Sequence, residues 1–219
     1  MHGVTACFVY IGVDKLNERS LSRDPDAIAV YSVSDSQEPT LVYEFPYAGT
    51  EGRIDDAFFL PIDDSQDEQL FVIHSMEKPR SWESVSDAYD VNVIRRQGAG
   101  IIQDQKLSRF FRWGTDLVSL HGEPDYIYPY KDRKAVTRAV NSKLFAAINA
   151  STPIAGTIQK KAFLYAGDTE PGLQDPKKMY LIRGDQILLE DSVAGWCKIF
   201  YEGKLAKITR WTQCKSIKF

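Results

Sequence analysis

The stretch that decides the fold class is residues 178–214, KMYLIRGDQILLEDSVAGWCKIFYEGKLAKITRWTQC. Its apolar residues come in short runs, and turn residues such as Gly184-Asp185, Gly195 and Gly203 separate these runs. Short apolar runs between such turns are typical of antiparallel strands. Because closing a sheet on itself leaves few free strand edges, this stretch predicts a small antiparallel β-barrel.

The order of features around this stretch resembles the bacterial SH3-like domain. In that family a first strand and a long loop precede a turn with the pattern apolar-x-x-Gly-Asp. A strand that starts with Gly-Trp, a short hairpin and a closing Trp-containing strand then follow. The matching segments are residues 162–165, 166–178, 181–185, 195–201, 202–206 and 207–212. The resemblance covers residues 157–219 and implies a binding module or a structural appendage rather than a catalyst.

The same resemblance points to a ligand surface. Eukaryotic relatives bind proline-rich peptides, and some bacterial relatives bind cell-wall peptides. The candidates for an aromatic binding face in this sequence are Tyr165, Tyr180, Trp196 and Trp211. The alternative is that Trp196 and Trp211 belong to the core or the rim of the barrel.

Length and charge bound the remaining possibilities. The 219 residues suffice for one large domain or two small ones, and the net charge of −3 gives no general affinity for nucleic acid. No apolar run is long enough to span a membrane. Residues 157–219 carry 11 Lys and Arg against 7 Asp and Glu, whereas residues 1–156 carry 16 against 23. The acidic N-terminal part therefore suits a basic partner.

Two of the three cysteines, Cys197 and Cys214, flank the last predicted hairpin. A bridge between them would stabilise the fold by about 3 kcal/mol in the chain-entropy model. It would also indicate an oxidising compartment such as the periplasm. Two buried free thiols are the alternative, with a cytoplasmic location. No signal peptide is visible, and residues 1–3 are compatible with the replacement of one.

The N-terminal part, residues 1–150, is expected to be a β-rich domain that ends in a helix. Alternating apolar runs separated by polar turns predict antiparallel strands, arranged as a sandwich or a propeller-like fragment. The predicted strands are residues 5–13, 27–33, 40–46, 57–61, 70–76, 89–95, 101–111, 114–120 and 126–130. The fold class is therefore mainly β, with one helix and a C-terminal SH3-like barrel at residues 157–219.

The strong helix signal is residues 132–150. Asp132 can cap this helix, and its apolar residues fall on one face. Asn141-Ser142 would kink the helix or split it in two. Residues 151–156, which contain Pro153, are expected to form the linker between the two domains.

Residues 57–73 weakly resemble a degenerate FG-GAP or VCBS-type β repeat. That family implies a calcium loop, and Asp63, Ser65 and Asp67 stand at alternating positions as oxygen ligands do. Both glycines of the family loop are missing and the loop is short. A solvated acidic turn is the alternative, and we predict no metal and no cofactor.

The sequence offers no recognisable catalytic set. Its histidines, His2, His74 and His121, lack metal-ligand spacing, and neither a nucleophile elbow nor a phosphate-binding glycine loop occurs. We therefore expect a non-enzymatic protein, and an enzyme of unrecognised type is the least favoured class.

An acidic β-rich body joined to a small barrel resembles the immunity or inhibitor proteins that are encoded beside secreted antibacterial effectors. We expect such a protein to occlude its toxin's active site; binding of peptidoglycan through the SH3-like domain is the alternative. Partner contacts are expected in two loops, where Trp82 supplies an aromatic anchor and acidic residues steer a basic partner. These residues are Arg80, Trp82, Glu83, Asp63, Asp64, Asp67 and Glu68. Trp82 folding back over the sheet is the bland alternative.

Overall fold

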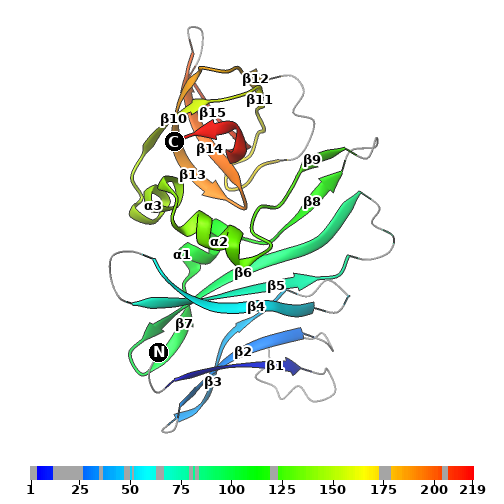
Figure 1. The fold of residues 1–219 in the computed structure, drawn as a ribbon, viewed down its shortest axis with the longest axis vertical. Coiled ribbons are helices and arrows are strands. Elements are labelled where there is room, and N and C mark those ends of the chain that lie inside the picture. The colour runs from blue at the N-terminus through cyan, green and yellow to red at the C-terminus, as the bar shows by residue number, and fades with distance from the viewer. Residues whose placement is uncertain are drawn as a thin grey trace. The chain divides into compact units, whose positions relative to one another are not determined.

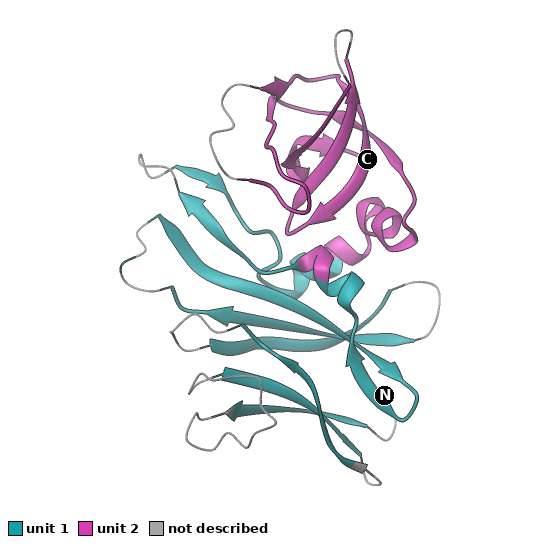
Figure 2. Cartoon of the chain, turned by 180° about the vertical axis from the view of Figure 1, so that it is seen from behind, with its two compact units in different colours: residues 1–108, 112–137 teal, residues 109–111, 138–219 magenta. Residues whose placement is uncertain are grey.

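The chain is mainly β and divides into two compact units (Figure 1, Figure 2). The computed structural model describes residues 4–11, 27–34, 37–46, 50, 52–62, 67–78, 81, 84–118, 123–172, 179–203 and 207–219. Unit 1 comprises residues 1–108 and 112–137, and unit 2 comprises residues 109–111 and 138–219. The prediction of a β-rich chain with few helices is confirmed.

Unit 1 contains two antiparallel sheets. The first has the order β1-β2-β3, formed by β1 (Thr5–Ile11), β2 (Ala27–Ser34) and β3 (Gln37–Glu44). The second has the order β4-β5-β6-β8-β9, and β7 pairs with β6 at its side. Its strands are β4 (Gly52–Pro61), β5 (Glu68–Met76), β6 (Val85–Gln97), β7 (Gly100–Gln103), β8 (Gly114–Val118) and β9 (Pro124–Tyr126).

One apolar cluster joins these two sheets. The first sheet contributes Ile28 and Val30, and the second contributes Leu70, Val72 and Ile94. All of them are at most 5% exposed. Residues two apart on a strand point to the same face, so the alternation along β5 turns Leu70 and Val72 toward the first sheet. The two sheets therefore pack as a sandwich around this cluster.

Polar side chains cap the N-terminal ends of two helices. Asp104 accepts a hydrogen bond from the Leu107 amide at the start of α1 (Gln105–Phe111), and Ser142 accepts one from Phe145 at the start of α3 (Lys143–Ala150). The helix predicted over residues 132–150 is split into α2 (Arg133–Val140) and α3. The prediction of a strand over residues 101–111 is wrong for its second half, because the Asp104 cap favours a helix there.

Unit 2 is built on a five-stranded antiparallel sheet with the order β15-β14-β13-β10-β16. The strands are β10 (Ile154–Ile158), β13 (Gln186–Val193), β14 (Trp196–Glu202), β15 (Lys207–Gln213) and β16 (Ile217–Lys218). A separate two-stranded ladder consists of β11 (Ala162–Phe163) and β12 (Tyr180–Leu181). A single 3₁₀ turn, Cys214–Ser216, precedes β16.

Two sequence-based expectations for unit 2 are corrected. Residues 151–156 are not a free linker, because β10 begins at Ile154 and pairs with both β13 and β16. The five-stranded sheet is also not closed into a barrel in the part of the chain that the structure describes. There β11 and β12 pair only with each other. Tyr165, which follows β11 by two residues, forms an isolated bridge with Trp211 of β15.

Candidate functional site

An exposed aromatic pair, Phe163 and Tyr180, stands on the β11–β12 ladder of unit 2. The two side chains are 37% and 50% exposed, and their ring centroids lie 6.4 Å apart in an edge-to-face arrangement. The ammonium group of Lys161 lies 4.8 Å from the Phe163 ring centroid and 4.2 Å from that of Tyr180. Large aromatic rings with this exposure are the kind of side chain that anchors protein interfaces.

The local sequence fixes the outward direction of this pair. Neighbours along a strand face opposite sides, so burial of Ala162 and Leu181 in the unit 2 core turns Phe163 and Tyr180 outward. The Leu164 amide also donates a hydrogen bond of 3.0 Å to the Met179 carbonyl. The backbone pairing of β11 with β12 and the burial of the neighbouring residues therefore hold Phe163 and Tyr180 in place.

An exposed aliphatic side chain follows the ladder in the chain. Ile182 stands directly after the end of β12 and is 57% exposed. We call Lys161, Phe163, Tyr180 and Ile182 together the aromatic surface. It offers flat apolar area next to a positive charge, an arrangement that suits a peptide or protein segment with apolar and acidic groups.

Three of the four aromatic residues predicted for a binding face lie elsewhere. Trp196 is 4% exposed and Trp211 is fully buried, and the Trp211 indole donates a hydrogen bond of 3.1 Å to the Gly167 carbonyl. Tyr165 packs edge-on against Trp196, with ring centroids 4.8 Å apart. These three side chains support the fold, and Tyr180 is the one that reaches the aromatic surface. Phe163 was not predicted, because Ala162, Phe163 and Leu164 are all apolar and only the structure shows that Phe163 faces outward.

Most of the residues predicted for the partner-binding loops lie outside the described residues. This applies to Asp63, Asp64, Arg80, Trp82 and Glu83. Asp67 and Glu68 are described, and both are exposed at the start of β5. In the described ranges no group of three His, Cys, Asp or Glu side chains could hold a metal ion. The calcium loop suggested for residues 63–67 falls mostly outside these ranges.

The structure joins Cys197 and Cys214 in a disulfide bond with a Cα–Cα distance of 5.1 Å. Cys197 lies on β14 and Cys214 directly follows β15, so the bond ties two neighbouring strands at one end of the sheet. The third cysteine, Cys7, is exposed on β1 and lies outside this bond. The pair is the one that the sequence suggested.

A buried polar cluster lies inside the sandwich of unit 1. His74 and Asp90 are register partners on β5 and β6, and they are 1% and 6% exposed. Burial lowers the pKa of His74 to about 4, although the charge of Asp55 opposes this change. Burial raises the pKa of Asp90 to about 6, although hydrogen bonds from Asn92 and Tyr43 favour its ionised form. Because neither group reaches the surface, we assign this cluster to stability rather than to ligand contact.

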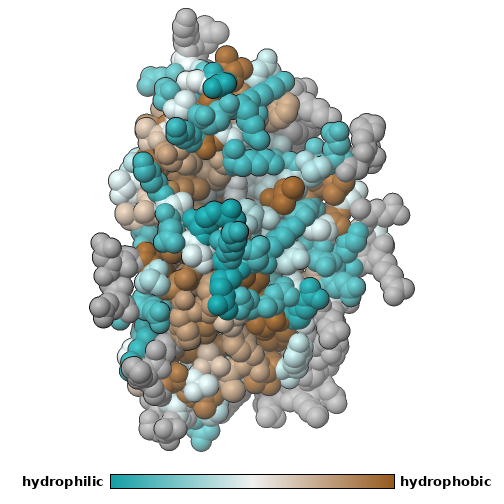
Figure 3. Space-filling view, in the orientation of Figure 1, coloured by the Kyte–Doolittle hydropathy of each residue, from teal (hydrophilic) through white to brown (hydrophobic). Residues whose placement is uncertain are grey.

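Exposed apolar residues also occur on unit 1, and Figure 3 shows such residues gathered on one of its faces. Separately, Val9 on β1 and Phe59 on β4 are 41% and 47% exposed. Nothing in the structure shows what would cover this face, so we assign it no site.

Comparison with known protein families, with curated proteins and with solved structures gave no match to this chain. None of the helices in the described residues is long and apolar enough to cross a membrane.

Proposed function

We propose that this chain is a non-enzymatic protein-binding protein, and more specifically an immunity or inhibitor protein that neutralises a secreted bacterial toxin by covering its active site. The observation that carries this proposal is the aromatic surface on unit 2, with Phe163 and Tyr180 exposed on a paired ladder. Two exposed aromatic rings contribute little to the stability of the folded core, whereas their burial in a complex contributes to the binding free energy.

The rigidity of this surface supports the same function. Interfaces lose affinity when side chains must be ordered on binding, at a cost of about 0.5–1.5 kcal/mol for each flexible side chain. Phe163 and Tyr180 are held in contact with each other and with Lys161 before any partner arrives. Such preorganisation suits an inhibitor that must bind tightly and quickly.

Charge supplies the second supporting argument. Residues 1–156 carry 16 basic and 23 acidic residues, so this part of the chain attracts basic proteins. Long-range attraction between opposite charges raises the association rate of a complex and falls as salt increases. We expect the partner to carry a basic surface that this acidic part attracts.

We also infer that unit 2 is an SH3-like module. The strands β13, β14 and β15 follow the turns Gly184-Asp185 and Gly195 and the hairpin after Glu202, as the family pattern implies. This order favours a binding role for unit 2 over a catalytic one.

The experiment that tests the proposal is growth protection. We expect a gene next to that of this chain to encode a toxic protein, and cells that produce this toxin should survive when the chain is co-expressed in the same compartment. The double variant Phe163→Ala/Tyr180→Ala should lose this protection, and Leu188→Ala should retain it, because Leu188 is 44% exposed on β13 outside the aromatic surface. Equal protection by both variants would disprove the role of the aromatic surface.

Sedimentation with purified peptidoglycan separates the alternative function. A chain that works by binding the cell wall should pellet with peptidoglycan and give no protection against the toxin. An inhibitor without cell-wall affinity should stay in the supernatant.

A further inference from the structure

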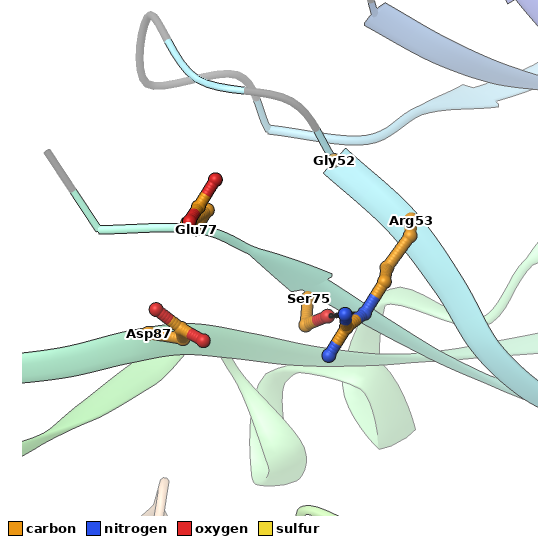
Figure 4. Close-up of a pocket in the computed structure, with 5 residues that line it drawn as sticks. All are labelled: Gly52, Arg53, Ser75, Glu77 and Asp87. Carbon is orange, nitrogen blue, oxygen red and sulfur yellow. Dashed lines mark hydrogen bonds between the residues drawn. The ribbon is translucent and has the colours of Figure 1, made fainter.

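A polar pocket of about 300 Å³ opens on unit 1, far along the chain from the aromatic surface. Among the described residues, Gly52, Arg53, Ser75, Glu77 and Asp87 line the pocket; they come from β4, β5, β6 and the segment directly after β5. Figure 4 shows the Arg53 guanidinium beside Ser75 on one side, and the carboxylates of Asp87 and Glu77 on the other. The pocket therefore presents opposite charges at two ends of one cavity.

The guanidinium of Arg53 is fixed in direction by its inner nitrogen. Arg53 Nε donates to Asp55 Oδ1 at 2.7 Å and to Ser75 Oγ at 3.1 Å. Ser75 is 2% exposed, so it forms a rigid floor under the guanidinium. Both hydrogen bonds use Nε, and within the described residues no hydrogen bond engages the two terminal nitrogens of Arg53. An arginine held in this way presents two parallel N–H groups that fit a carboxylate.

The opposite end of the pocket presents carboxylate oxygens. Asp87 Oδ1 accepts a hydrogen bond of 3.0 Å from the Lys78 amide, which fixes the carboxylate of Asp87, and no hydrogen bond from another described residue engages Oδ2. The Glu77 side chain is exposed at the rim, and no ion pair of its carboxylate occurs within the described part of the chain. Two carboxylates at this end favour ammonium groups, which donate up to three hydrogen bonds each.

We propose that this pocket binds a free basic amino acid. The ligand carboxylate pairs with the terminal nitrogens of Arg53, and its two cationic groups, the α-ammonium and the side-chain cation, pair with Asp87 and Glu77. The described lining of the pocket has two acidic groups, Glu77 and Asp87, and one basic group, Arg53, which complement a ligand with two cationic groups and one carboxylate. A volume of about 300 Å³ is at the small end of ligand pockets and suits a molecule of this size.

This site is independent of the proposed toxin binding. All of its lining residues belong to unit 1, whereas the aromatic surface belongs to unit 2. Either proposal can therefore fail without affecting the other.

The test is isothermal titration of the full chain with L-lysine, L-ornithine and L-arginine at pH 7. We expect saturable binding of at least one of them, and binding at least about tenfold weaker for n-butylamine, which lacks the carboxylate. Absence of saturable binding for all three amino acids, or binding of n-butylamine as tight as that of the best amino acid, would overturn the proposal.

Variants then assign the two ends of the pocket. Arg53→Gln and Glu77→Gln should each weaken binding of the amino acid by about tenfold or more, because each removes one charged hydrogen-bonding partner. Asp67→Asn is the matched control, since Asp67 is an exposed acidic residue that does not line the pocket. If Arg53→Gln lowers the melting temperature, Glu77→Gln decides the matter, because the exposed Glu77 side chain makes no described contact with the core. Unchanged affinity in Glu77→Gln, or an equal loss in Asp67→Asn, would refute the assignment.

Discussion

The pKa values of His74 and Asp90 are shifted in opposite directions on folding. We therefore predict that the free energy of unfolding of unit 1 contains two pH dependences of opposite sign. His74 has a folded pKa of about 4 against its usual 6.5, so the unfolded chain takes up this proton first as pH falls. Its stabilising contribution is complete above pH 6.5 and is lost as pH falls toward 4. Asp90 has a folded pKa of about 6 against its usual 3.8, so its contribution is complete below pH 3.8 and is lost as pH rises through 6.

The magnitudes of the two contributions nearly cancel. A difference of one pKa unit corresponds to about 1.4 kcal/mol, so each group changes the free energy of unfolding by about 3 kcal/mol across its range. Between pH 4 and pH 6.5 the wild-type chain loses the His74 contribution and gains the Asp90 contribution as pH falls. We therefore expect these two groups together to leave little net slope.

Single substitutions should reveal each slope. In Asp90→Asn only His74 remains, so the free energy of unfolding should fall by about 3 kcal/mol more than in the wild type as pH goes from 6.5 to 4. In His74→Phe, which keeps a ring against Phe45, the stability should instead rise by about 3 kcal/mol relative to the wild type over the same range.

Urea unfolding followed by circular dichroism at half-unit pH steps measures these slopes. Asp67→Asn is the control, because it removes an exposed carboxylate instead of a buried one. Parallel pH profiles for the wild type, Asp90→Asn and His74→Phe would refute the reasoning.

Two further predictions concern packing and covalent stability. Removal of the disulfide in Cys197→Ala/Cys214→Ala should lower the free energy of unfolding by about 3 kcal/mol in chemical denaturation, and an unchanged midpoint would contradict this. Gly52→Ala should destabilise unit 1 by about 1–3 kcal/mol, because an added Cβ would lie 2.6 Å from His74 Nε2. Gly100→Ala, whose Cβ would meet its nearest neighbour at 3.5 Å, is the control, and equal melting temperatures for the two glycine variants would count against the steric argument.

Strand positions near glycine turns could be predicted from the sequence. The turns Gly184-Asp185 and Gly195 are followed directly by β13 and β14, because glycine permits the left-handed backbone that ends one strand before the next. Gly184 and Gly195 do have positive φ angles, 97° and 79°. The turn residues alone were therefore sufficient to predict where β13 and β14 begin.

The helix α1 was missed although its signal was present. Leu107, Phe110 and Phe111 are buried at the spacing of one helix face, and Asp104 stands where an N-cap is expected. The apolar run before them, Ile101 and Ile102, belongs to β7 and drew the strand prediction too far. A short apolar run does not by itself distinguish a strand from a helix.

The strand β10 was missed for a different reason. Gly156 reads as a linker residue, but the structure places it where a Cβ would lie 2.7 Å from Ile217 and 2.9 Å from Phe219. This glycine allows close packing rather than a flexible joint, a distinction that depends on residues about sixty positions away. The polar pocket was missed in the same way, because it joins residues of three strands that only the fold brings together.

The aromatic surface could be predicted in part. Its aromatic side chain makes Tyr180 a candidate for a binding face, and the structure leaves it exposed. The same criterion also selects Trp196 and Trp211, which are buried. Large aromatic rings serve cores and interfaces equally well. Residue type alone does not separate these two roles, whereas burial does.

The most direct test of the proposed function is the affinity of the purified chain for the purified toxin that we expect a neighbouring gene to encode. We expect a dissociation constant below about 1 µM for the wild type, and a loss of at least about 2 kcal/mol in binding free energy for Phe163→Ala/Tyr180→Ala with an unchanged melting temperature. Undetectable binding of the wild type would contradict the proposed function, and wild-type affinity in the double variant would contradict the aromatic surface as its site.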